Sequence, residues 1–140
     1  MRETVAAELG PLAGEVLDVA TGSAYFAMAL VGKHPGIHVT AIDIHGLETA
    51  RKNVDERRLS DRITLKEMDA TSLEFEENSF DHVVNFLGLE DIHMTRGREG
   101  VEKAFKEARS VLKPGGSFCF VAMPSETSSR SSPGYATRLG

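Results

Sequence analysis

The sequence predicts an α/β protein built on one parallel β-sheet. Apolar runs of strand length alternate along the chain with segments whose apolar residues recur at helical spacing. The first two expected strands also carry carboxylates at their ends, Asp18 and Asp43, where packing gives no reason for a charge. A strand, a loop of small residues, a helix and a second strand form a βαβ unit, so we expect right-handed crossovers between parallel strands.

Each expected element has a local signal. A first helix is expected over Glu3–Leu9 and stops at Gly10-Pro11, which breaks helical structure. Pro35-Gly36 ends the next helix, and Lys113-Pro114-Gly115-Gly116 ends the last, whose apolar stripe is the clearest in the chain. The helical stripes between strands cover about residues 26–31, 47–54 and 101–112. The expected strands are Glu15–Val19, Ile37–Ile42, Arg62–Glu67, Phe80–Leu87 and Ser117–Met123.

Composition limits the function classes. A chain of 140 residues is one domain with room for a hydrophobic core. A net charge of −5 argues against a general nucleic-acid or membrane-surface binder. No apolar run has the length of a membrane span or signal peptide, so we expect a cytoplasmic protein. Cys119 lies in an apolar strand, which favours packing over nucleophilic chemistry, and the histidines lack ligand spacing, so no metal is expected.

The loop after the first strand suits a ligand. Its residues, Ala20-Thr21-Gly22-Ser23-Ala24, are small, so backbone N–H groups can approach a ligand closely, and the following helix N-terminus adds partial positive charge. Asp43, at the tip of the second strand, faces such a loop in a βαβ unit and can accept both hydroxyls of a ribose. The residues therefore predict a nucleoside-type cofactor.

A family resemblance rests on motifs in register along the chain. They are Asp18-Val19-Ala20-Thr21-Gly22-Ser23-Ala24, Asp43, Met68-Asp69-Ala70, Phe80-Asp81-His82-Val83-Val84 and Leu112-Lys113-Pro114-Gly115-Gly116. With this order and spacing the chain resembles the class I S-adenosylmethionine-dependent methyltransferases over roughly residues 10–124. The resemblance implies a Rossmann-like parallel sheet of strand order 3-2-1-4-5, with S-adenosylmethionine as the cofactor.

The resemblance also implies residue roles at the nucleoside end. Asp43 resembles the ribose ligand, and Ile44 beside it belongs to the same site. Asp69 resembles the residue whose side chain contacts the adenine amino group, with the Ala70 backbone near the ring. Asn85, at the end of the fourth strand, is also assigned to the cofactor site.

At the methionyl end, Asp18 resembles the acid that serves the ammonium group, directly or through water, and Ala20 and Gly22 belong to the adjoining loop. The family loop is often D-x-G-x-G-x-G, whereas this chain has Ala20 and Ala24 at the first and third glycine positions. Asp-Val-Ala-Thr-Gly is similar to the loop of some quinone-type C-methyltransferases. We expect the Ala24 methyl to crowd the methionyl end, and a positive φ there to cost stability. A nicotinamide-binding G-x-G-x-x-G is the more distant match, because only Gly22 is kept.

The C-terminal part departs from the family pattern. Family sheets usually have seven strands, with the last two forming an antiparallel pair, and this chain is expected to lack both. The expected organisation is therefore a cofactor-binding domain over residues 1–124 and a polar, flexible tail over 125–140. Strand five would then be an apolar sheet edge, which a second copy, a partner subunit or the tail could cover.

The acceptor side is less defined. We expect it at the ends of strands four and five, near Asn85, Glu90, Asp91, His93 and Met123. An acid or His93 could act as a general base, or these could be solvated loop charges, so no catalytic residue is assigned. Two functions stay open: methyl transfer to a small-molecule acceptor, or a methyltransferase-like binding or regulatory subunit without activity of its own.

Overall fold

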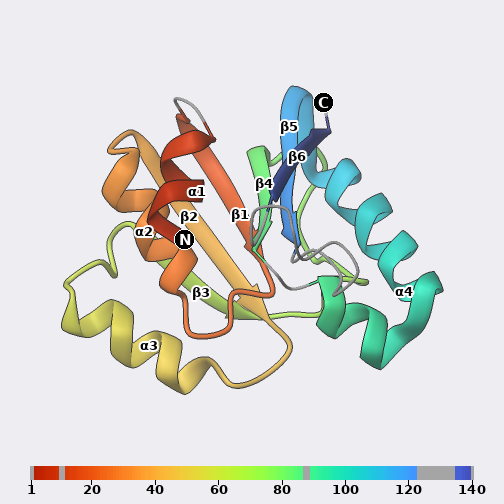
Figure 1. Ribbon diagram of the computed structural model, residues 1–140, viewed down its shortest axis with the longest axis horizontal. Helices are drawn as coiled ribbons and strands as arrows, with labels where there is room; N and C mark the ends of the chain where they lie inside the picture. Colours follow the sequence, from red (N-terminus) through yellow and green to blue (C-terminus); the bar gives the residue numbers. More distant parts are fainter. Residues whose placement is uncertain (1, 10–11, 87–88, 123–134, 140) are drawn as a thin grey trace.

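The computed structural model describes residues 2–9, 12–86, 89–122 and 135–139 (Figure 1). Its strands form one sheet in the order β3-β2-β1-β4-β5-β6. The strands are β1 Gly14–Val19, β2 Ile37–Asp43, β3 Ile63–Glu67, β4 Phe80–Phe86, β5 Leu112–Ala122 and β6 Tyr135–Leu139. The helices are α1 Arg2–Glu8, α2 Tyr25–Lys33, α3 Leu47–Glu56 and α4 Leu89–Val111. Strands β1 to β5 pair in parallel, which confirms the predicted α/β class and the strand order 3-2-1-4-5.

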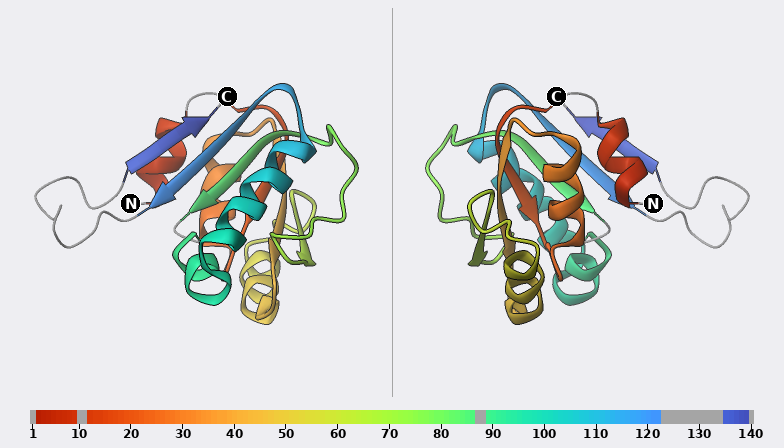
Figure 2. Two further views of the ribbon diagram at one scale, coloured as in Figure 1. Left: turned by 90° about the vertical axis from the view of Figure 1, so that its right-hand side faces the viewer. Right: turned by 90° about the vertical axis from the view of Figure 1, so that its left-hand side faces the viewer.

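Two hydrophobic cores lie on opposite faces of the sheet. Neighbouring side chains of a strand point to opposite faces, so Val16 packs with α1, α2 and α3, whereas Leu17 packs with α4. In β4, Val84 and Val83 divide in the same way. Figure 2 shows the result: α4 lies in front in its left view, and α2 and α3 lie in front in its right view. Burial on both faces explains why these strands read as nearly continuous apolar runs.

The C-terminal residues correct one expectation. Tyr135–Leu139, which the sequence placed in a flexible tail, forms β6 and pairs antiparallel with β5 from Phe118↔Leu139 to Ala122↔Tyr135. Strand β5 is therefore not the sheet edge, and the bare apolar edge that predicted a partner there is covered by the chain itself. The rest of the expected tail, residues 125–134 and 140, lies outside the described residues.

Helix α4 is longer than its apolar stripe predicted. It begins at Leu89 and contains Gly97, whose φ of 69° and ψ of −168° break the helical path into two segments. The helix ends at Val111, as the Pro-Gly-Gly sequence predicted. Strand β5 then starts irregularly, because its register against β4 shifts between Leu112 and Ser117.

Asp81 connects the N-terminal ends of β1, β4 and β5. Its carboxylate accepts the Glu15 backbone N–H at 2.8 Å and lies 3.3 Å from Lys113 Nζ. The hydrogen bond from Glu15 is the main cause that lowers the pKa of Asp81, although burial opposes it and Lys113 adds to it. Gly14 makes room for this arrangement: a Cβ on Gly14 would lie 2.1 Å from Asp81 Oδ2.

Candidate cofactor site

In the loop between β1 and α2, every second residue from Ala20 to Ala24 has a left-handed backbone conformation. Ala20, Gly22 and Ala24 have φ values of 58°, 58° and 68°. The loop closes through Ala24 N–H donating to Thr21 O at 2.9 Å, and α2 begins with Met28 N–H donating to Ala24 O at 3.0 Å. Ala24 thus has the positive φ that we expect to cost stability. Its side chain, however, is fully buried in the core of α1 to α3, so the methyl does not occupy the open side of the loop.

Asp43 joins the tip of β2 to this loop. Its Oδ2 accepts the Gly22 N–H at 2.8 Å, and its Oδ1 accepts the Ile44 N–H at 2.7 Å. Each carboxylate oxygen keeps acceptor capacity, because a carboxylate offers about four lone-pair positions. Ile44 beside it is 45% exposed, one of two large apolar side chains in the described residues that are exposed. An acceptor beside an exposed apolar side chain suits a sugar carrying a flat base.

Asp18 is buried at the end of β1, only 1% exposed. Its Oδ2 accepts a hydrogen bond from Thr21 Oγ1 at 2.7 Å. Burial disfavours the charged carboxylate and raises the pKa of Asp18 from 3.8 to about 7. The Thr21 hydrogen bond opposes this rise, and the negative charge of Asp43 adds to it. Asp18 and Asp43 therefore both accept hydrogen bonds from residues of the loop.

Asp69 follows β3 and is held from two sides. Its Oδ1 accepts both the Thr71 N–H at 2.8 Å and Thr71 Oγ1 at 2.7 Å, while its Oδ2 forms an ion pair with Arg96 from α4. Burial alone would raise the pKa of Asp69, but the Thr71 hydrogen bonds and then the Arg96 charge hold it below the ordinary value. Asp69 is therefore an acceptor at neutral pH. The neighbouring Ala70 packs against the α4 side of the sheet.

Asn85 lies at the end of β4, 2% exposed, and donates from Nδ2 to Val19 O at 3.2 Å. The amide thus supports the start of the loop after β1. On the expected acceptor side, the side chains of Glu90, Asp91 and His93 and the whole of Met123 lie outside the described residues.

Sequence reasoning missed three partners of the acids. Thr21 bonds Asp18 from three residues away, and Thr71 bonds Asp69 from two residues away, so both had a local signal: a hydroxyl residue just after an acid. Arg96 is 27 residues from Asp69 in the sequence. No spacing rule connects them, because the contact exists only once α4 has packed.

The residues fit the implied cofactor. Asp18 and Asp43 supply acceptors and negative charge, which suit an ammonium group, a sulfonium and ribose hydroxyls. The loop has room above it, since a side-chain carbon on Gly22 would meet nothing within 4 Å. All of these residues lie at the C-terminal ends of the parallel strands, where ligands bind in open α/β sheets.

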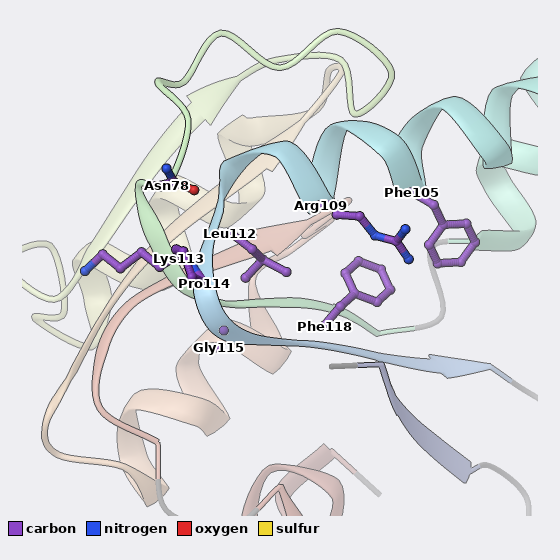
Figure 3. Close-up of a pocket in the computed structure, with 9 residues that line it drawn as sticks. Asn78, Phe105, Arg109, Leu112, Lys113, Pro114, Gly115 and Phe118 are labelled. Atoms are coloured by element: carbon purple, nitrogen blue, oxygen red, sulfur yellow. The ribbon is translucent and has the colours of Figure 1, made fainter.

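A separate cavity of about 390 Å³ lies at the opposite end of the strands from the predicted cofactor site, beside the start of β5 (Figure 3). Figure 3 shows Arg109 pointing toward the rings of Phe105 and Phe118. The cavity is lined by Asn78, Phe105, Arg109, Leu112, Lys113, Pro114, Gly115, Gly116 and Phe118. It contains none of the predicted cofactor residues and borders the N-terminal end of β5, so it is not the cofactor site.

Comparison with known proteins gives the family. A protein-family model described as a methyltransferase domain matches residues 16–116, which include the loop, the acids and the Pro-Gly-Gly turn. The chain belongs to the S-adenosylmethionine-dependent methyltransferase family. S-adenosylmethionine is the cofactor of this family. The match also confirms the resemblance predicted from the sequence motifs.

Individual proteins share sequence or fold with the chain. This chain is 36% identical over 105 residues to the ubiquinone/menaquinone biosynthesis C-methyltransferase UbiE of Brucella suis. The matched region covers 73% of this chain and 37% of that protein. The chain thus spans little more than a third of this relative's length. Among solved structures it resembles the PH0226 protein of Pyrococcus horikoshii, with a TM-score of 0.77, 28% identity and coverage of 91% and 54%. It also resembles the [4+2]-cyclase SpnF, with a TM-score of 0.73, 25% identity and coverage of 89% and 47%.

Within the part of the chain that the structure describes, no helix is long and apolar enough to cross a membrane.

Proposed function

We propose that this domain binds S-adenosylmethionine at the C-terminal edge of its sheet and transfers the methyl group to a small-molecule acceptor. The observation that carries the proposal is the meeting of Asp18, Asp43 and the loop around Gly22 in one place. Asp18 would accept from the ammonium group, and Asp43 from the ribose hydroxyls. Asp69 would accept from the adenine amino group, with Ile44 and Ala70 packed beside the ring and Asn85 supporting the loop at Ala20.

The bound cofactor supplies an electrophilic methyl group on a positively charged sulfur. The chain's own contribution is to orient the cofactor and to exclude water, because in-line methyl transfer depends mainly on positioning. Buried Asp18 fixes the amino-acid end, and Asp43 fixes the ribose relative to the loop. The name of the Brucella suis relative favours a carbon atom of a quinone-like small molecule as the acceptor.

The first experiment is calorimetric titration of the chain with S-adenosylmethionine and S-adenosylhomocysteine. We expect micromolar dissociation constants for the wild type and weakening by about 10- to 100-fold in Asp43→Asn, because charge-assisted hydrogen bonds are lost. Asp55→Asn is the matched control, since Asp55 is exposed on α3. A folded wild-type chain that binds neither compound would overturn the proposed function.

The second candidate is cofactor binding without methyl transfer, as in a binding or regulatory subunit. The structural similarity to a protein named as a [4+2]-cyclase supports this second candidate, because it indicates that the fold carries more than one activity. Incubation with cofactor carrying an isotope-labelled methyl group and a panel of quinols and phenols separates the two. Label in an organic product supports methyl transfer, whereas tight binding without labelled product across the panel supports the second candidate.

A further inference from the structure

Asp69 and Arg96 form the one ion pair among the described residues that joins α4 to the predicted cofactor site. We propose that Arg96 is a positioning residue, an inference that rests on the proposed function. Arg96 orients the Asp69 carboxylate so that the site accepts the amino group of adenine and rejects an oxo group at the same position. Arg96 acts through Asp69 and has no role in the chemical step. None of the sequence motifs includes it.

The hydrogen-bond geometry at Asp69 carries the proposal. Its Oδ1 accepts two hydrogen bonds, from the Thr71 N–H and from Thr71 Oγ1, which use both lone pairs of that oxygen. Its Oδ2 accepts from Arg96, so one acceptor position remains there. A carboxylate fixed from both sides thus presents one free lone pair in a set direction. An exocyclic amino group can donate to it, whereas an oxo group would meet it with a second acceptor.

The ion pair also connects the first segment of α4 to the loop that follows β3. Arg96 immediately precedes Gly97, at which the helical path breaks, so it is the last residue of the first segment, 89–96. Its contact with Asp69 connects this segment to the loop after β3. The side chain of Arg96 is 44% exposed and that of Asp69 is 29% exposed, so a ligand can reach the pair.

Arg98 offers a matched control two residues away. Its Nε lies 3.4 Å from Glu102 Oε1 on the same helix, and its side chain is 88% exposed. Loss of Arg98 removes the same positive charge from α4 without touching Asp69. A difference between Arg96→Ala and Arg98→Ala therefore reports the contact with Asp69 and not the charge of the helix.

The test compares two ligands that differ at the base: S-adenosylhomocysteine and its inosine analogue, which carries an oxo group in place of the amino group. We expect the wild type to prefer the adenosine form by about 30-fold or more, because a site built to hydrogen-bond an amino group rejects its absence strongly. In Arg96→Ala we expect adenosine-form binding to weaken about tenfold and the preference to fall below about fivefold. Arg96→Lys should restore part of both, and Arg98→Ala should change neither by more than about twofold.

The remaining outcomes overturn the proposal. Tighter binding by Arg96→Ala would mean that Arg96 competes with the base for Asp69. Equal weakening of both ligands, with the preference kept, would mean that Arg96 only stabilises the fold. Unchanged binding would show that Asp69 needs no positioning. Failure of the wild type to bind either ligand would instead overturn the proposed function, and this inference with it.

Discussion

Replacing Asp18 with asparagine should stabilise the chain above neutral pH while removing the proposed ammonium ligand. Asp18 is 1% exposed, and burial raises its pKa to about 7. Asparagine has nearly the same shape, stays neutral at every pH, and can still accept the hydrogen bond that Thr21 Oγ1 now donates at 2.7 Å. The substitution therefore removes the charge and keeps the packing.

The magnitude follows from proton linkage. In the unfolded chain Asp18 loses its proton near its ordinary pKa of 3.8, and in the folded chain near 7. Between these values the folded state holds more protons, so the stabilising contribution is complete below about pH 4 and is lost as pH rises through 7. A shift of about three units corresponds to roughly 4 kcal/mol, since one unit is about 1.4 kcal/mol. The Asp18→Asn variant has no such loss, because its amide does not titrate.

Urea unfolding of the wild type and Asp18→Asn at pH 5, 6, 7 and 8 measures this difference. We expect the advantage of the variant in free energy of unfolding to grow by about 2–3 kcal/mol between pH 5 and pH 8, because part of the wild-type loss already occurs between pH 4 and pH 5. This growth is on the order of 10 °C in melting temperature. Asp55→Asn, an exposed control, should not show the trend. A difference that stays constant from pH 5 to pH 8 would refute the burial argument. Binding of S-adenosylhomocysteine by Asp18→Asn should weaken at least about tenfold.

Three further substitutions test the contacts at Gly14 and Ala24, with Gly32 as a control. Gly14→Ala places a Cβ 2.1 Å from Asp81 Oδ2 at a φ of 89°, so it should destabilise the fold by about 2–4 kcal/mol in urea unfolding. Gly32→Ala in α2 meets nothing within 4 Å and should instead stabilise by about 0.5–1 kcal/mol; equal effects of the two would contradict the contact. Ala24→Gly should leave the dissociation constant of S-adenosylhomocysteine within about threefold, because the methyl is buried in the core, and should change stability by less than about 1 kcal/mol. A large gain in affinity would show that the methyl crowds the ligand after all.

The sheet could be predicted from the sequence because its signals are local. The parallel strands are largely apolar runs, except β3, where Ile63 and Leu65 alternate with polar residues, and the helical stripes lie between the strands. Strand β6 was missed because its stability comes from pairing with β5 and not from its own composition. Tyr135, Thr137 and Leu139 do alternate with Ala136 and Arg138, but this short pattern follows a serine-rich stretch that dominated the interpretation.

Two aspartates in apolar strands show what the sequence could not distinguish. Asp81 receives the Glu15 N–H and lies beside Lys113, which together outweigh burial and lower its pKa. Asp18 receives the Thr21 hydroxyl, faces the like charge of Asp43, and has a raised pKa. No cation pairs with Asp18 in the part of the chain that the structure describes. The charge of Asp81 is therefore stabilised by groups of the chain itself, and its role is structural. The charge of Asp18 instead costs stability until a positively charged ligand binds. This cost is the physical reason to place the ammonium group at Asp18.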